Sequence, residues 1–258
     1  MKKRIISAII IILIFIISLC VNKIFFTLLM TLCGILALKE LLKVHNIESL
    51  SLLNLLSYLN LIVIILSNNI IKINTTYPII LTILISLMLL VFYNDNKKYN
   101  INNALYVMGC IILLGLSFNN IINFRITSVS LCIYIFLLSS ITDTFAYIGG
   151  SLIGKHKLTE ISPKKTWEGS IVGTVMGSIF SIMYYITVVN NLPLIPVIIM
   201  SILLTILSQI GDLVFSDIKR YFNIKDYSNI IPGHGGILDR FDSIIFVSLG
   251  LTLILELL

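Results

Sequence analysis

The feature that most constrains this chain is a series of long apolar runs. A helix needs roughly 20 apolar residues to cross a bilayer core of about 30 Å. Nine runs are candidates, and they lie at residues 5–22, 24–41, 52–67, 78–93, 104–119, 129–149, 170–189, 194–212 and 243–258. The sequence therefore predicts an all-α polytopic membrane protein with about nine transmembrane helices. Eight spans stay open as an alternative, because the last run is short.

Composition excludes the other broad classes. Hydrophobic residues make up 58% of the chain and charged residues 12%, whereas an ordinary soluble domain is about half apolar and about a quarter charged. A disordered chain and a soluble globular enzyme are both excluded. The short gap at Asn22 and Lys23 predicts a tight hairpin between the first two spans.

The basic residues predict the orientation. The cluster at residues 2–4 places the N-terminus in the cytoplasm under the positive-inside rule. With nine spans, Lys97 and Lys98 also lie inside, and only Lys23, Lys72 and Arg125 of the 18 basic residues lie outside. The net charge of +6 needs no nucleic acid, because cytoplasmic helix ends also face anionic lipid. We expect a multi-pass protein of the cell membrane.

The two halves of the chain differ in chemistry. Residues 1–128 carry spans but few polar residues suited to catalysis, which predicts a scaffold. In residues 129–258, eight of the 12 acidic residues of the chain lie between Asp143 and Asp242, which predicts a catalytic region. No internal repeat is apparent, and this disfavours the inverted repeats of many transporters.

The densest polar stretch runs from residue 211 to 243. If the eighth span continues as a helix, Asp212, Ser216 and Lys219 share one face, where they suit a divalent ion and a phosphate. Asp212 and Asp239 come from different helices and could share one Mg²⁺, which typically takes one or two protein carboxylates. The turn at residues 232–236 could bind an anion through its backbone N–H groups.

Simpler interpretations compete with these. A solvated juxtamembrane loop with positive-inside charge explains Lys225 adequately, and a turn histidine such as His234 is more often a local hydrogen-bonding residue than a catalyst. Upstream, Asp143 lies within an apolar run, where a carboxylate indicates a functional site unless it pairs with a neighbouring helix. Lys164 and Lys165 could hold a triphosphate, with positive-inside charge as the alternative.

The spacing of these residues resembles the phosphatidate cytidylyltransferases (CDP-diacylglycerol synthases). The family signature is matched without a departure by Ser216, Lys219, Arg220, Lys225, Asp226, Ser228, Pro232, His234, Gly235, Gly236, Asp239, Arg240 and Asp242. The pieces at 143–147 and 162–169 also look like the family. The first half matches only as a hydrophobic scaffold.

The resemblance implies that CTP and phosphatidate react to give CDP-diacylglycerol and pyrophosphate at a cytoplasmic-facing site. It implies Mg²⁺, held by Asp212 and Asp239, with a second monovalent cation in some members, and a homodimer. The residues it assigns to catalysis are Asp212, Ser216, Lys219 and Asp239. Those it assigns to substrate binding are Lys164, Lys165, Arg220, Lys225, His234, Gly235, Gly236, Arg240 and Asp143, the last without a settled role.

Two other classes of function remain open. A transporter would use Asp143 as an ion-coupling carboxylate and would turn over no nucleotide. A CTP-dependent kinase of a membrane alcohol would release CDP instead of pyrophosphate. The full signature from Ser216 to Asp242 argues against both.

Overall fold

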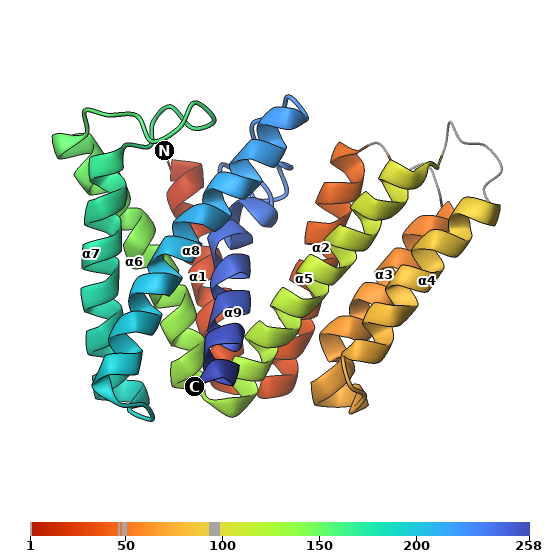
Figure 1. Cartoon of the computed structure of the whole chain (residues 1–258), viewed down its shortest axis with the longest axis horizontal. Coiled ribbons are helices and arrows are strands. Elements are labelled where there is room, and N and C mark those ends of the chain that lie inside the picture. Colours follow the sequence, from red (N-terminus) through yellow and green to blue (C-terminus); the bar gives the residue numbers. More distant parts are fainter. Residues whose placement is uncertain (1, 46, 48–50, 93–98) are drawn as a thin grey trace. The chain divides into compact units, whose positions relative to one another are not determined.

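The structure, a computed structural model, describes residues 2–45, 47, 51–92 and 99–258, which are mainly helical and form no β-strand (Figure 1). Within these ranges nine α-helices form: α1 (Lys2–Val21), α2 (Lys23–Val44), α3 (Ser51–Leu66), α4 (Thr76–Phe92), α5 (Ile101–Thr127), α6 (Val129–Ile153), α7 (Trp167–Tyr184), α8 (Leu194–Tyr221) and α9 (Leu238–Leu257). Two short π-helices follow α3 and α7: η1 (Ser67–Ile71) and η2 (Tyr185–Val189). Lys97 and Lys98 lie outside the described residues.

The all-α prediction is confirmed, since each predicted span falls on one α-helix. Six segments are long and apolar enough to cross a membrane: Lys23–Val44, Leu52–Ile71, Ile101–Thr127, Val129–Ile153, Trp167–Val189 and Leu194–Tyr221. Two further apolar stretches, Ile10–Val21 and Thr76–Phe92, are shorter. The count of nine spans therefore stays a prediction.

Several helices extend beyond the apolar runs that predicted them. Helix α8 continues past residue 212 to Tyr221, and α5 continues past residue 119 to Thr127. Helix α9 begins at Leu238, ahead of the predicted residue 243. The runs stop at the first polar residues, whereas a helix continues where such residues find partners on neighbouring helices.

The described chain divides into two compact units, each with its own packing. The first unit comprises Met1–Asn123 and Asp226–Asp239, and the second comprises Phe124–Lys225 and Arg240–Leu258. The predicted division into a scaffold (1–128) and a catalytic region (129–258) is a statement about function, and it stays a prediction.

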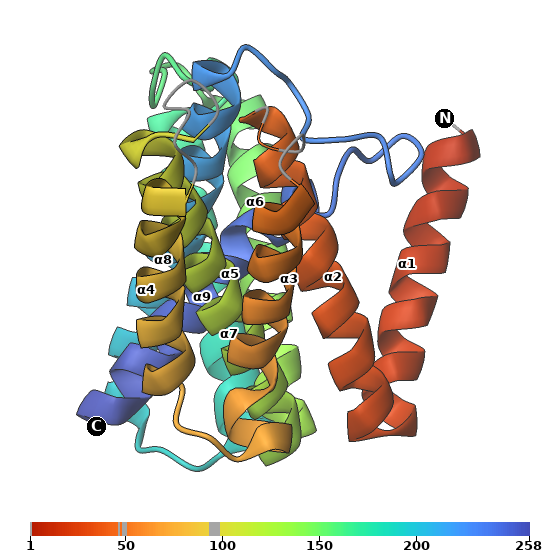
Figure 2. The same ribbon diagram turned by 90° about the vertical axis from the view of Figure 1, so that its right-hand side faces the viewer.

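Asparagine side chains cap one helix of the first unit and join others. Asn22 caps α2 by accepting a hydrogen bond from Ile24 N at 3.2 Å, which makes the predicted hairpin of α1 and α2 a one-residue connection (Figure 2). Asn60 on α3 donates to Thr82 Oγ1 on α4 at 2.8 Å. Asn119 on α5 donates to the carbonyl of Ile65 at 2.8 Å, next to the point where α3 gives way to η1.

Glycines set the packing of the second unit, in which α6, α7 and α8 lie side by side (Figure 1). Gly169, Gly173 and Gly177 recur every four residues along one face of α7. A Cβ on Gly173 would lie 2.8 Å from Ala146 Cβ and 2.9 Å from Thr142 O, both on α6. Small residues let two helices in a membrane approach closely. This approach fixes the start of α7, and with it the loop that precedes it.

Candidate active site

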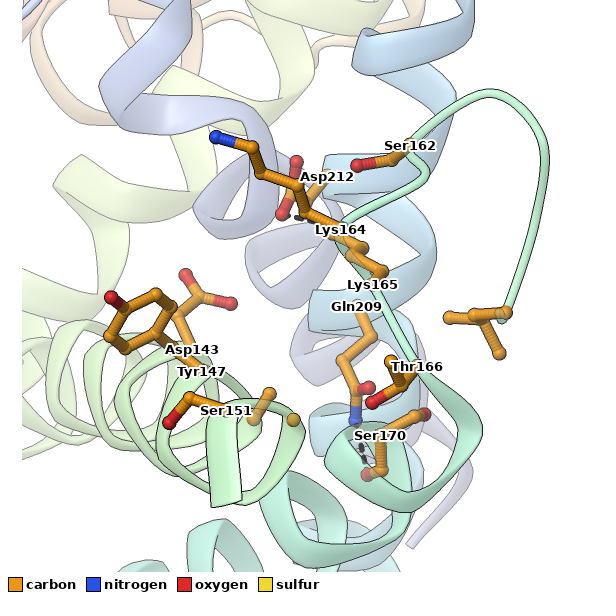
Figure 3. A pocket seen from close by; sticks show the side chains of 13 residues that line it. Asp143, Tyr147, Ser151, Ser162, Lys164, Lys165, Thr166, Ser170, Gln209 and Asp212 are labelled. Carbon is orange, nitrogen blue, oxygen red and sulfur yellow. Dashed lines mark hydrogen bonds and ion pairs between the residues drawn. The ribbon is translucent and has the colours of Figure 1, made fainter. Parts of the chain in front are cut away.

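A cavity of about 370 Å³ in the second unit gathers four of the predicted site residues (Figure 3). Its walls come from α6, α8, the start of α7 and the loop between α6 and α7. The lining residues are Asp143, Ala146, Tyr147, Gly150, Ser151, Leu158, Ser162, Lys164, Lys165, Thr166, Ser170, Gln209 and Asp212. The fold brings Asp143 of α6, the adjacent Lys164 and Lys165 of the loop and Asp212 of α8 to one hollow of a size typical for small-molecule sites.

Asp212 is the best-connected charge in this cavity. Its Oδ2 lies 2.6 Å from Lys165 Nζ, and its Oδ1 accepts a hydrogen bond from Ser216 Oγ at 3.3 Å. Both charged side chains keep partial access to solvent, at 28% for Lys165 and 27% for Asp212. The predicted helical face of Asp212 and Ser216 is confirmed, because α8 is continuous through both residues.

The loop before α7 is held by Glu168, whose role was missed from the sequence. Glu168 Oε2 accepts hydrogen bonds from the backbone N–H groups of Lys155 and His156 at 3.1 and 3.2 Å. Glu168 Oε1 lies 2.6 Å from His156 Nδ1. Thr166 caps α7 by accepting from Gly169 N at 3.1 Å. The loop therefore closes on itself and presents Lys164 and Lys165 to the cavity (Figure 3).

Gln209 also lines the cavity, although no sequence pattern singled it out. Its Nε2 donates to Thr174 Oγ1 at 2.8 Å and to the carbonyl of Ser170 at 3.3 Å. These two bonds join α8 to the first turns of α7. An amide within an apolar helix was the only available signal, and several other spans contain such amides.

The signature loop, residues 226–239, belongs to the first unit. Asp239 Oδ2 accepts hydrogen bonds from Tyr227 N at 3.0 Å and from Gly236 N at 2.9 Å, so the carboxylate ties the two ends of the loop together. The turn between them contains Gly233 at φ 78° and Gly235 at φ 84°, a left-handed conformation that favours glycine.

Two N–H groups of the predicted anion-binding turn are used inside the protein. His234 N donates to the carbonyl of Ile231 at 3.0 Å, and Gly236 N donates to Asp239. At the end of the turn, Ile237 N and Leu238 N donate to the carboxylate of Glu40 at 2.9 Å each. Glu40 lies in the half of the chain predicted to be a scaffold, and no role was predicted for it.

The remaining predicted residues lie near helix ends or in the signature loop. Lys219 and Arg220 are in the last turn of α8, where Arg220 Nη1 donates to the carbonyl of Ile224 at 3.1 Å. Lys225 and Arg240 are exposed, and His234 is half-buried. Their predicted contacts with substrate stay predictions.

The donor set of α8 fits a magnesium ion. Asp212 and Ser216 supply a carboxylate and a hydroxyl on adjacent turns, and the ammonium of Lys165 already lies where a cation would meet Asp212 Oδ2. No group of three or more His, Cys, Asp or Glu side chains suited to a metal forms among the described residues. Mg²⁺ rarely needs one, because water and substrate phosphate complete its shell. Asp212 and Asp239 belong to different units, so their sharing of one ion stays a prediction.

Comparison with known proteins gives one consistent result. The sequence profile of the Cytidylyltransferase family matches residues 2–258. A protein of Staphylococcus saprophyticus named phosphatidate cytidylyltransferase is 36% identical over 249 residues, which is 96% of each chain. Proteins of the same name from Staphylococcus haemolyticus and Staphylococcus aureus are 38% and 33% identical, again over 96% of each chain. The chain belongs to the cytidylyltransferase family.

Proposed function

We propose that this protein is a phosphatidate cytidylyltransferase. A phosphate oxygen of phosphatidate forms a bond to the α-phosphorus of CTP, and the bond from that phosphorus to the bridging β-phosphate oxygen breaks. Pyrophosphate leaves with the electron pair, and CDP-diacylglycerol remains in the membrane. The observation that carries this proposal is the match to enzymes of that name over 96% of the chain.

The cavity of the second unit suits the nucleotide half of this reaction. The phosphatidate phosphate is already an anion, so the step needs no general base, and its main difficulty is repulsion between two anionic phosphates. Lys164 and Lys165 line the cavity and would neutralise the triphosphate. Since Lys165 pairs with Asp212 at 2.6 Å, it would turn from that carboxylate to the phosphate when CTP enters.

The residues of α8 and the signature loop would hold the rest of the reacting groups. Ser216 and Lys219 would bind substrate phosphate, with Arg220, Lys225, His234, Gly235, Gly236 and Arg240 contributing to the same sites. When bound by Asp212 and Asp239, Mg²⁺ supplies positive charge to the reacting phosphates. A second, monovalent cation would bind beside Mg²⁺. Asp143 on α6 lines the cavity, and no step of the reaction is assigned to it.

The proposal extends to the placement of the protein. Nine spans with a cytoplasmic N-terminus would open the site to CTP in the cytoplasm while the diacyl chains stay in the cell membrane. Six helices already meet the length and apolarity that a span requires. A homodimer is part of the proposal, on the family resemblance alone.

Two labelled forms of CTP test the reaction directly. The purified protein is incubated with phosphatidate and CTP carrying ³²P at either the α- or the γ-phosphate. Cytidylyl transfer moves the α-label into lipid and the γ-label into pyrophosphate, and chelation of Mg²⁺ by EDTA abolishes both. A lipid product that carries the γ-label would instead identify a kinase. Absence of nucleotide turnover would contradict the proposal and revive the transporter alternative.

A further inference from the structure

The carboxylate of Glu40 contacts both ends of the signature loop. Glu40 lies near the C-terminal end of α2, and its side chain is buried, with 2% exposure. Its Oε1 accepts from Ser228 Oγ at 2.6 Å and from Ile237 N at 2.9 Å. Its Oε2 accepts from Leu238 N at 2.9 Å. All three donors belong to the 226–239 segment of the same compact unit.

These contacts are specific to a carboxylate. A buried charge is costly unless donors surround it, and here the three donors are uncharged groups that a carboxylate can satisfy together. Two of them are backbone N–H groups at the start of α9, where the helix dipole also favours a negative charge. Glu40 therefore caps α9 from another helix.

The last glycine of the turn at residues 232–236 makes room for this contact. A Cβ on Gly236 would lie 2.5 Å from Glu40 Oε1 and 2.7 Å from its Cδ. Gly236 N donates in turn to Asp239 Oδ2, which also holds Tyr227 N. Glu40 and Asp239 thus form one network that fixes the backbone on both sides of the turn.

We infer that Glu40 is a positioning residue for the reaction: its carboxylate holds the signature loop in the conformation that presents Asp239 and the glycine turn to the substrates. The effect of Glu40 on catalysis rests on the proposed function. Its effect on the loop conformation rests only on contacts within the first unit. Glu40 would touch no substrate; it acts through the loop. Small displacements of reacting groups are expensive, since a misplacement of about 1 Å can cost about 100-fold in rate.

The test is Glu40→Gln, which keeps the shape of the side chain. In either orientation the glutamine places an NH₂ group against at least one of the three donors, so the loop loses part of its anchor. We expect kcat to fall about 10- to 100-fold, with the KM for CTP changed by less than about threefold. Hydrogen–deuterium exchange of the 226–239 segment should rise in the same variant.

Thr82→Val is the matched control for a merely structural effect. It removes the buried bond between Asn60 and Thr82 in the same unit and leaves the loop contacts intact. Its thermal unfolding midpoint should fall as far as that of Glu40→Gln, while kcat and loop exchange stay at the wild-type values. Ser228→Ala removes one donor to Glu40, together with the acceptor of the exposed Ile230 N at 3.3 Å, and should give an intermediate kcat.

The two readouts separate failure of the inference from failure of the proposed function. Unchanged loop exchange in Glu40→Gln, or an equal loss of kcat in Thr82→Val, would overturn the positioning role. A wild-type protein that forms no CDP-diacylglycerol, with loop exchange still raised in Glu40→Gln, would overturn the proposed function and support the anchor.

Discussion

Single side chains carry the clearest chemistry in this protein, and Asp212 is the first to test. Its two oxygens face Lys165 Nζ and Ser216 Oγ, and an amide would preserve the shape and the contact with Ser216. If Asp212 holds a metal ion, Asp212→Asn should lower kcat by about 10²–10³, as loss of one preorganised electrostatic group does. The unfolding midpoint in detergent should hardly move.

Asp239→Asn should lower kcat to a similar extent and also leave the unfolding midpoint nearly unchanged. Its stability should hold because an amide oxygen can still accept hydrogen bonds from Tyr227 N and Gly236 N. The double variant should be little worse than either single one, since residues that act as a unit are non-additive. Asp217→Asn is the matched control: Asp217 is an exposed carboxylate of the same helix, and its replacement should leave kcat within about twofold. Normal turnover in Asp212→Asn at ordinary Mg²⁺ concentrations would remove the metal assignment.

The lysines of the loop before α7 allow a second comparison. Lys165→Met keeps the apolar stem and removes the ammonium that pairs with Asp212. If Lys165 neutralises the triphosphate, the KM for CTP should rise about tenfold or more, equivalent to about 1.4 kcal/mol of binding. Lys157→Met, an exposed lysine of the same loop that does not line the cavity, should leave KM unchanged. If both substitutions raised the KM for CTP equally, Lys165 would contribute only to the overall positive charge of the loop and would not contact the triphosphate.

At this scale the sequence offered candidate residues but did not predict their contacts. A carboxylate inside an apolar run singled out Asp143, and the structure places it in one cavity with Lys164, Lys165 and Asp212, a grouping that was not predicted. Glu40 also lies inside an apolar run, but in the half of the chain predicted to be a scaffold, and no role was predicted for it. Partners 188 to 198 residues away cannot be inferred from local spacing.

Among the helices, the contact between α6 and α7 yields the next prediction. Gly173→Ala adds a Cβ that would lie 2.8 Å from Ala146 Cβ and 2.9 Å from Thr142 O, so α7 must shift away from α6. Overpacking of this kind typically costs about 1–3 kcal/mol. We expect a lower unfolding midpoint in detergent and a shorter half-life of activity on heating.

Gly109→Ala is the control within another helix. Nothing lies within 4 Å of the Cβ that it would add on α5. An alanine in a helix interior is more stable than glycine by about 0.5–1 kcal/mol, so this variant should be as stable as the wild type or more so. If the unfolding midpoint of Gly173→Ala equalled that of Gly109→Ala, the close packing of α6 against α7 would not contribute to stability.

Apolar runs located every helix but not every helix end. They stopped α5 near Asn119, whose side chain in fact donates to the carbonyl of Ile65 and so permits the helix to continue. They stopped α8 at Asp212, although Lys165 and Ser216 satisfy that carboxylate. Hydropathy treats each polar residue as exposed to lipid, and only the packed structure shows which of them have partners.

For the molecule as a whole, the number of helices that cross the membrane is the property to measure. Four predicted spans lie between Lys72 and Asn191, and this even number places both residues on the same side of the membrane. With a cytoplasmic N-terminus that side is the outer one. One span separates Asn191 from Glu160, which places Glu160 on the cytoplasmic side. Single cysteines at these three positions, in a chain with Cys20, Cys33, Cys110 and Cys132 replaced, report the sides directly. A membrane-impermeant maleimide should label positions 72 and 191 in intact cells, and position 160 only after permeabilisation. Retained activity checks that each variant is folded. Labelling of positions 72 and 191 from opposite sides would mean that one helix between them does not cross the membrane, and the nine-span arrangement would then be wrong.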